Sequence, residues 1–389
     1  MDDFIFHLPT KILFGEKLQE LRVECLKYGN RILLVYGGES VKKVGIYGEV
    51  VGALEGLEIT EFSGIEPNPR LESVKRGIEL AKDKGVDLVL ALGGGSVIDA
   101  AKAIAAGVKT PGDPWEFVLG NTEVLEALPL GTVLTLAATG SEMDAISVIS
   151  NMETKEKLGW SSEHIQPKFS LLNPRYTFSV SRRLSAAGVA DIMSHAMENY
   201  FRKDSGNYLA DRLAEGLLKT CVHFGPILLE EPENYEARAN IMWASSWAIN
   251  GLLSAGKAVP WSVHGLEHEL SAFYDLTHGI GLAILSGPYL RHVLGDKTQR
   301  KIAEFGYNVF DLPHSGDEYR DAFKAIEALE EFFSDELGLP LSLEEVGIDD
   351  QYFEEMARKI IRQKKGPING FTLLEEKDIL EIYRKSLRR

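Results

Sequence analysis

Residues 86–106 read VDLVLALGGGSVIDAAKAIAA, and this segment gives the strongest indication of the fold of the first half of the chain. An apolar run leads into Gly93, Gly94 and Gly95, and Ser96 follows as the expected cap of an amphipathic helix. This order predicts a buried parallel strand, a tight turn and a helix. Glycines let a ligand approach the backbone closely, and a helix start offers free N–H groups. The turn therefore predicts a pyrophosphate-binding site.

The same turn matches neither of the two standard nucleotide-binding fingerprints. The last glycine of a GxGxxG motif would fall on Ile98, and the GK[ST] ending of a P-loop is absent. A purely structural turn between strand and helix is therefore the alternative interpretation. Three successive glycines exceed what such a turn needs, which favours the ligand site.

Strands and helices alternate on both sides of this stretch, up to about residue 180. Apolar runs at 31–36, 87–92 and 132–137 end at glycines or small residues. Residues 68–85 form a helical pattern that opens with Asn and Pro and ends in Gly. Such alternation predicts βαβ units in a doubly wound parallel sheet. We therefore expect an α/β fold, with a Rossmann-like nucleotide-binding domain in the first half.

The pattern changes near Leu184, beyond which helical periodicity dominates and strand signals are absent. Pro174 and two serines mark the chain just before this change. The sequence therefore predicts two domains, an α/β domain over 1–180 and an all-helical domain over 181–389. The expected helices of the second domain are 185–204, 206–230, 234–254, 262–274, 316–337, 350–363 and 375–388.

A second glycine turn, Gly37 to Ser40, follows the first strand and bears on the choice of cofactor. If both turns lie at the carboxyl ends of neighbouring strands, they border the crevice where doubly wound sheets bind nucleotides. The Glu39 carboxylate could accept hydrogen bonds from an adenosine ribose and would repel a 2′-phosphate, which favours NADH over NADPH. Ser40, Lys42 and Lys43 could instead receive that phosphate, and Glu39 could equally be an ordinary first-turn residue.

A third candidate segment, residues 134–144, reads LTLAATGSEMD and comes after the third strand. Thr135, Thr139 and Ser141 provide hydroxyls suited to contacts with a sugar or a phosphate. Polar residues are common at strand ends, so only the position of this segment supports a ligand-binding role.

Histidines cluster in the helical half, where five of the nine fall between 195 and 278. Asp191 and His195 are four residues apart, so on a helix they face the same side. His264 and His268 have the same spacing, and His278 is expected at the start of the next helix, after an aromatic turn. One carboxylate and three imidazoles can complete a site for iron(II) or zinc and leave room for a substrate oxygen. The alternative is that these are ordinary helix residues, because such pairs also arise by chance.

The amino-acid composition indicates which classes of binding partner can be excluded. The 389 residues include 42 Lys and Arg against 58 Asp and Glu, a net charge of −16, which argues against binding nucleic acid or an anionic membrane. The acidic start lacks the basic region of a signal peptide, and no run of 18 uncharged apolar residues occurs, so we expect a cytoplasmic protein. Cys25 and Cys221 form no CxxC motif and are expected to be small buried hydrophobes.

Taken together, these segments resemble the iron-containing (group III) alcohol dehydrogenase family. The resemblance spans essentially the whole chain and is nearest to the NAD(P)H-dependent butanol dehydrogenase and aldehyde reductase branch. Its motifs run in order from FIFHLPTKILFG at 4–15 through YGGESVKKVG, GGGSVIDAAK and ATGSE to DIMSHAMENY at 191–200 and the pair His264 and His278. The resemblance implies a dehydroquinate synthase-like fold with a metal-binding helical domain.

The resemblance also assigns roles to individual residues. It implies that the metal ligands are Asp191, His195, His264 and His278, with His268 as an additional active-site histidine near the metal. The implied cofactor-binding residues are Gly38, Glu39, Ser40, Gly94, Gly95, Ser96, Asp99, Thr135, Thr139 and Lys157. Relatives that carry a third glycine at the position of Glu39 tend to use NADPH, so this departure favours NADH here.

The implied reaction is reversible hydride transfer between NAD(P)(H) and a primary alcohol or aldehyde. An aliphatic substrate of the butanol and butyraldehyde type, and a homodimer, follow from the resemblance alone. The proton is expected to pass through His268 or a ribose hydroxyl, since imidazole ordinarily titrates near pH 6.5. The alternatives are another enzyme of this fold, such as a glycerol dehydrogenase or a dehydroquinate synthase, and a nucleotide-binding regulatory protein without catalysis.

Overall fold

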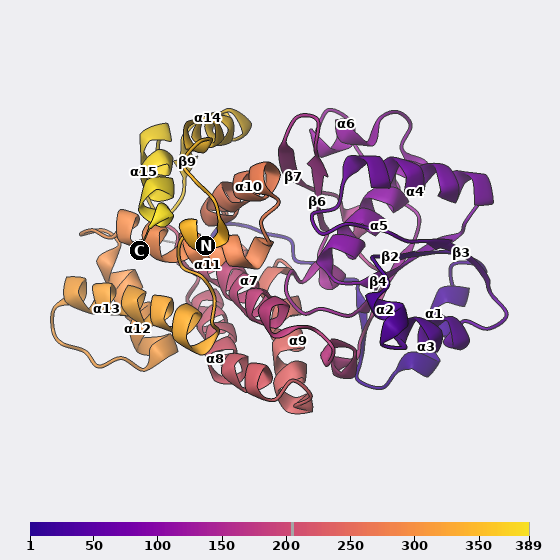
Figure 1. Cartoon of the computed structure of the whole chain (residues 1–389), viewed down its shortest axis with the longest axis horizontal. Coiled ribbons are helices and arrows are strands. Elements are labelled where there is room, and N and C mark those ends of the chain that lie inside the picture. The colour runs from indigo at the N-terminus through magenta and orange to yellow at the C-terminus, as the bar shows by residue number, and fades with distance from the viewer. Residues whose placement is uncertain (204–205, 389) are drawn as a thin grey trace. The chain divides into compact units, whose positions relative to one another are not determined.

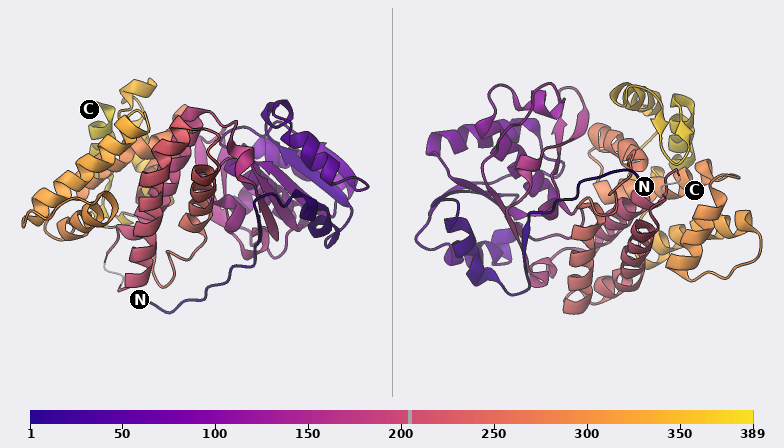
Figure 2. Two further views of the ribbon diagram at one scale, coloured as in Figure 1. Left: turned by 90° about the horizontal axis from the view of Figure 1, so that it is seen from below. Right: turned by 180° about the vertical axis from the view of Figure 1, so that it is seen from behind.

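The computed structural model of the chain describes residues 1–203 and 206–388, which form two compact units. One unit comprises residues 7–180, and the other comprises residues 1–6 together with the chain from Ser181 onward. The first six residues therefore differ from the expected division, because the backbone N–H of Asp2 donates to the carbonyl of Gly256 (2.9 Å). The segment before the first strand is extended (Figure 2). Residues 204, 205 and 389, which the expected second domain includes, lie outside the described residues, as does the end of its first helix.

The first unit is built on a parallel sheet of six strands in the order β1-β8-β5-β4-β2-β3. The three apolar runs of the sequence form its centre as β2, β4 and β5. Strands β1, β3 and β8 were not among the predicted runs. Strands β1 and β3 form the half-exposed edges and lack a continuous apolar run, and the buried β8 is only four residues long with a serine inside it. The strands are β1 (Lys11–Phe14), β2 (Arg31–Tyr36), β3 (Glu58–Phe62), β4 (Leu88–Gly93), β5 (Leu130–Leu134) and β8 (Phe169–Leu172).

Helices cover both faces of this sheet (Figure 1). Ile32 and Leu34 of β2 pack in one cluster with Cys25 of α1 and Val50 of α3, whereas Leu33 and Val35 are buried on the opposite face. The predicted doubly wound α/β fold is therefore confirmed. The helices are α1 (Leu21–Leu26), α2 (Ser40–Lys43), α3 (Ile46–Ala53), α4 (Leu71–Lys84), α5 (Gly95–Lys109) and α6 (Pro114–Val118). A hairpin of β6 (Ile146–Asn151) and β7 (Glu156–Ser161) and 3-10 turns at Leu18–Glu20, Ser141–Met143, Glu163–Ile165 and Pro174–Thr177 complete the unit.

The order of the strands determines where a ligand can bind. From β2 the chain proceeds to β3 on one side, and from β4 it proceeds to β5 on the other side. The sheet therefore reverses direction between β2 and β4, and open α/β sheets bind ligands at the carboxyl ends of strands beside such a reversal. Both glycine turns of the sequence follow these two strands.

The second unit is mainly helical. Its helices are α7 (Arg182–Tyr200), α8 (Tyr208–Glu230), α9 (Tyr235–Ile249), α10 (Ser262–Tyr274), α11 (His278–Val293), α12 (Gln299–Phe310), α13 (Glu318–Glu331), α14 (Phe353–Gln363) and α15 (Glu376–Leu387). A π turn at Phe332–Glu336 follows α13, and a 3-10 turn lies at Glu344–Val346. None of the described helices combines the length and the apolar character of a membrane-spanning helix.

Two features of this unit differ from the sequence prediction. The sequence analysis did not predict α12. It expected a helix to start at His278 but did not predict where that helix, α11, ends. Helix α11 is apolar nearly all round and buried, so it shows no amphipathic stripe. A short antiparallel pair, β9 (Ile368–Asn369) and β10 (Leu373–Leu374), also occurs where only helices were expected.

Helix α7 lies at the centre of this unit and packs against α8, α9, α10 and α11. Every residue from Ser185 to Tyr200 is buried. Its start is fixed by Ser181, whose side chain accepts a hydrogen bond from the backbone N–H of Leu184. A helix buried on all sides gives its polar residues fixed positions, and Asp191 and His195 lie in its middle.

Candidate metal centre and nucleotide-binding turns

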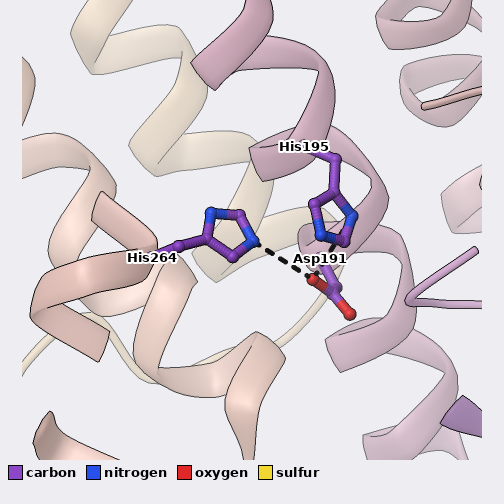
Figure 3. Close-up of side chains that lie close together, drawn as sticks. All are labelled: Asp191, His195 and His264. Carbon is purple, nitrogen blue, oxygen red and sulfur yellow. Dashed lines mark ion pairs between the residues drawn. The ribbon is translucent and has the colours of Figure 1, made fainter. Parts of the chain in front are cut away.

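The four predicted metal ligands come together around one carboxylate oxygen. Asp191 Oδ1 lies 3.6 Å from His195 Nδ1, 3.9 Å from His264 Nε2 and 3.7 Å from His278 Nε2. Asp191 and His195 project from α7, His264 lies on α10 and His278 is the first residue of α11. Figure 3 shows the rings of His195 and His264 facing the carboxylate from two helices. Three helices therefore bring four polar side chains to one point.

The environment of this group fits a divalent metal ion. Asp191, His195 and His264 are buried, and neither His195 Nδ1 nor His264 Nε2 has a hydrogen-bond partner among the described residues. Burial, together with the neighbouring His264 and His278, lowers the pKa of His195 well below its ordinary value, so the ring is neutral and can donate a lone pair. Ligands about 2.1 Å from a tetrahedral ion lie roughly 3.4 Å apart, close to the observed spacing. The donor set suits zinc and iron(II) alike.

A buried glutamate that the sequence analysis missed holds His264 in place. Glu198 accepts hydrogen bonds from the backbone N–H groups of Ser262 and His264 (2.8 Å each), and its Oε1 lies 3.2 Å from His264 Nδ1. A carboxylate on one ring nitrogen fixes the tautomer and directs the other nitrogen to the metal. Glu198 lies seven residues after Asp191, a spacing that puts both residues on the same face of α7. This spacing could have pointed to Glu198 from the sequence.

A second glutamate, also missed, holds His278. Glu267 is fully buried, contacts His278 Nδ1 and accepts a hydrogen bond from the Ser271 hydroxyl. Gly281 makes room for it, because a Cβ at that position would lie 2.7 Å from Glu267 Cγ. Two of the three imidazoles therefore each have a carboxylate on the nitrogen that faces away from Asp191.

His268 lies beside the candidate metal ligands. Its ring centroid is 5.5 Å from that of His278 and 6.5 Å from that of His264. It groups with Glu267 and His278, whose possible ligand atoms lie within 4.8 Å of one another, and not with the set around Asp191. This position suits a proton relay, and that role stays a prediction.

The glycine turn after β4 differs in detail from the expectation. Helix α5 begins at Gly95, so Gly94 is its cap and Ser96 lies inside the first turn. No side chain among the described residues caps this helix start, which leaves backbone N–H groups available to a phosphate. A Cβ at Gly95 would lie 2.3 Å from Thr139 Oγ1, so packing also requires a glycine here.

The structure brings several of the predicted cofactor-binding residues together. The backbone N–H of Thr135 donates to the carbonyl of Gly93 (3.0 Å), and Thr139 packs on Gly95. The turn after β2 lies next to the same helix start, since a Cβ at Gly37 would be 3.7 Å from Val97 Cγ2. Gly38, Glu39 and Ser40 are exposed there, and the space around Gly38 is open. The two turns therefore lie next to each other at the carboxyl ends of β2 and β4.

Asp99 has internal partners. Its carboxylate accepts hydrogen bonds from Ser141 Oγ (2.6 Å) and from the backbone N–H of Val148 (3.0 Å). Beside it, the fully buried Lys102 donates to Ser141 (2.9 Å) and Asp144 (2.5 Å). Burial raises the pKa of Asp99 to about 6. This buried network ties α5 to β6, and the cofactor contact expected of Asp99 stays a prediction, as does that of the buried Lys157 on β7.

Comparison with known proteins gives matches over both units. Residues 9–174 match the family model described as iron-containing alcohol dehydrogenase. Residues 185–387 match the model described as the C-terminal part of the Fe-containing alcohol dehydrogenase family.

Individual relatives match along almost the whole chain. The chain is 49% identical over 389 residues to NADH-dependent butanol dehydrogenase A of Clostridium acetobutylicum, covering 99% of this chain and 100% of that protein. It is 41% identical to the NADPH-dependent aldehyde reductase YqhD of Escherichia coli, covering 92% and 93%. Among solved structures, NADH-dependent butanol dehydrogenase A from Thermotoga maritima is similar with a TM-score of 0.95 and 36% identity, covering 100% and 99%.

Proposed function

The chain belongs to the iron-containing alcohol dehydrogenase family, and we propose that it transfers hydride between NAD(P)(H) and primary alcohols or aldehydes. The observation that carries this proposal is the convergence of three imidazole nitrogens on Asp191 Oδ1. The glycine turns beside β2 and β4 support the dinucleotide half of the reaction. One unit supplies the candidate metal ligands and the other supplies the candidate cofactor-binding residues.

The metal would be held by Asp191, His195, His264 and His278. When bound, the metal would supply a Lewis acid for the substrate oxygen, and a nicotinamide cofactor would supply or accept the hydride. Glu198 and Glu267 keep His264 and His278 in the tautomers that present a lone pair to the ion. The burial of Asp191 excludes water from its carboxylate, which strengthens its attraction for a cation.

His268 is the candidate for moving the proton of the substrate hydroxyl. Oxidation of an alcohol releases a proton as well as a hydride, and an imidazole nitrogen of His268 can accept it. In the reverse direction the same nitrogen returns the proton to the carbonyl oxygen. The ribose hydroxyl of the cofactor is the alternative group for this step.

The backbone N–H groups of Gly95 and Ser96 are proposed to bind the pyrophosphate, and the turn at Gly38 to Ser40 the adenosine ribose. Relatives of both cofactor preferences are known, an NADH-dependent butanol dehydrogenase and an NADPH-dependent aldehyde reductase. Glu39 would repel a 2′-phosphate, so we propose that NADH is preferred.

The proposal includes an aliphatic substrate of the butanol and butyraldehyde type. It also includes a homodimer that works in the cytoplasm, for which the family resemblance is the support. Sedimentation equilibrium tests the oligomeric state, with twice the mass of the chain as the expected result.

Metal analysis combined with substrate kinetics tests the proposed function. Purified protein should contain about one equivalent of divalent metal per chain and should oxidise NADH with a series of straight-chain aldehydes. Faster oxidation of glycerol than of butanol would favour the glycerol dehydrogenase alternative. Protein that holds no metal and shows no alcohol-dependent reduction of NAD(P) would contradict the proposal and support the nucleotide-binding regulatory alternative.

A further inference from the structure

A cluster of four side chains lies at the carboxyl ends of β2 and β3, and we call it the Glu61 cluster. It consists of Tyr36, Lys42, Tyr47 and Glu61. The Tyr36 and Tyr47 hydroxyls donate to the two oxygens of Glu61 (2.5 and 2.6 Å), so both carboxylate oxygens are used. Lys42 Nζ lies 3.5 Å from Glu61 Oε2 and 5.1 and 4.8 Å from the ring centroids of Tyr36 and Tyr47.

The cluster holds a cation whose charge is already compensated. The hydrogen bonds from Tyr36 and Tyr47 lower the pKa of Glu61, so its carboxylate is charged at neutral pH. The Lys42 ammonium therefore faces one negative charge and two aromatic ring faces, all of which attract it. Lys42 and Glu61 are 35% and 44% exposed, so a ligand that reaches this part of the surface meets both groups.

The position of the cluster relates it to the cofactor. Strands β2 and β3 pair in parallel, with Leu34 opposite Glu61 and Val35 opposite Phe62, so Glu61 lies at the same sheet edge as the turn after β2. Lys42 belongs to α2, which begins at Ser40 directly after that turn. In a doubly wound sheet the adenosine ribose binds at this edge, and its 2′ substituent is the only difference between NADH and NADPH.

We propose that Glu61 is a specificity-determining residue, which disfavours NADPH by neutralising Lys42, the cation that a 2′-phosphate would need. The inference rests on the proposed function and deepens it, because it explains cofactor choice by a residue outside the glycine turn. Glu39 adds a second negative charge at the same edge. The Glu61 cluster thus turns a lysine that could recognise NADPH into part of an NADH-selective surface.

The variant Glu61→Gln tests the inference directly. Glutamine keeps the size of the side chain and can still accept a hydrogen bond from a tyrosine, but it releases Lys42 from its countercharge. Dissociation constants for NADH and NADPH are measured from nicotinamide fluorescence, without turnover. NADPH should bind roughly three- to fivefold more tightly, the effect of one partly exposed charge pair, and NADH affinity should change less than about twofold.

Two matched variants separate this effect from others. Glu58→Gln removes an equal charge from the opposite end of β3 and should leave the ratio of the two affinities unchanged. Tyr47→Phe removes one hydroxyl that binds Glu61 but leaves both charges, and it should shift the ratio less than Glu61→Gln does. Equal shifts in Glu58→Gln and Glu61→Gln would overturn the inference, because they would show a general effect of net charge.

Lys42→Met provides a further test, and its first half, in the wild-type background, does not depend on the folding of the Glu61 variant. In the wild-type background this substitution should change NADPH affinity less than about twofold, because Lys42 is already neutralised. In the Glu61→Gln background it should abolish the gain. A gain that persists without Lys42, or a large loss in the wild-type background, would overturn the inference. If the wild type binds neither dinucleotide the proposed function itself fails, whereas tight NADH binding without these shifts contradicts only the inference.

Discussion

His268 can be separated experimentally from the metal ligands that surround it. Because it groups with Glu267 and His278 and not with the set around Asp191, His268→Ala should leave the metal content nearly intact. Turnover with butyraldehyde and NADH should fall by about 10²-fold, the typical value of a general acid or base. Metal content is measured by elemental analysis on the same sample. Loss of the metal in this variant would show that His268 is a ligand.

Glu267 acts on the metal through His278 and is a positioning residue. The variant Glu267→Gln keeps its shape but removes the charge that holds the Nδ1 proton of His278. Metal affinity, measured by competition with a chromogenic chelator, should fall about 10- to 100-fold.

The exposed Glu236 on α9 offers a control for this experiment. Glu236→Gln removes the same charge from a part of the helical unit without predicted ligands, and its metal affinity should equal that of the wild type. If Glu267→Gln also retains wild-type affinity, the positioning role of Glu267 is wrong.

At the scale of single residues, the sequence predicted the side chains that converge on the carboxylate of Asp191. It did not predict the glutamates that hold two of these histidines in place. Asp191 and His195 share a helix face by their spacing, and the resemblance added His264 and His278. Glu198 and Glu267 were missed because acidic residues are ordinary on solvated helix faces, and only tertiary packing shows that these two are buried.

At the scale of elements, Lys102 of α5 forms a buried ion pair with Asp144, just before β6, and donates to the carbonyl of Ile146 in β6 (2.7 Å). Lys102→Met would leave two buried carboxylates, Asp99 and Asp144, without their cation. The free energy of unfolding, measured with urea, should fall by about 3–5 kcal/mol. Lys109→Met on the same helix removes a half-exposed lysine 3.8 Å from Glu126 and should cost less than about 1 kcal/mol. Similar losses in both variants would mean that the buried ion pair contributes no more to the free energy of unfolding than an exposed one.

The same network makes stability depend on pH. Burial raises the pKa of Asp99 to about 6, above its value in the unfolded chain. A raised pKa gives a contribution to stability that is complete below the unfolded value near pH 4 and is lost as the pH rises through 6. Relative to Asp99→Asn, the wild type should therefore lose stability between pH 4 and pH 7. Urea unfolding at several pH values measures this difference, and a constant difference would contradict the raised pKa.

The elements that the sequence predicted best are the central strands, whose residues are mostly apolar and buried. The 31–36 run coincides with β2, and the 87–92 and 132–137 runs overlap β4 and β5, because each is apolar and buried between helical layers. The predicted helix 234–254 is longer than α9, which ends at Ile249 before a left-handed Gly251. Helices such as α11 were missed because complete burial removes the periodic pattern on which the prediction depends.

At the scale of the whole molecule, the two family matches cover both units, so the family and fold predicted from the motifs are confirmed. That prediction rested on the order in which the motifs occur along the chain. Cofactor preference was harder to predict, since the carboxylate that compensates the charge of Lys42 belongs to Glu61 on β3, which is distant in sequence. Contacts between elements that are distant in sequence are set by the fold and not by local spacing.

We propose that a metal ion held at Asp191 makes this chain an NADH-dependent alcohol dehydrogenase. The most direct test removes the metal with a chelator and titrates iron(II) or zinc back while NADH oxidation by butyraldehyde is followed. Activity should be absent without metal, rise in proportion to added metal and reach a plateau at about one equivalent per chain, and Asp191→Ala should not recover. Full activity in the metal-free protein, or recovery of Asp191→Ala at one equivalent, would show that catalysis does not need a metal ion held by Asp191.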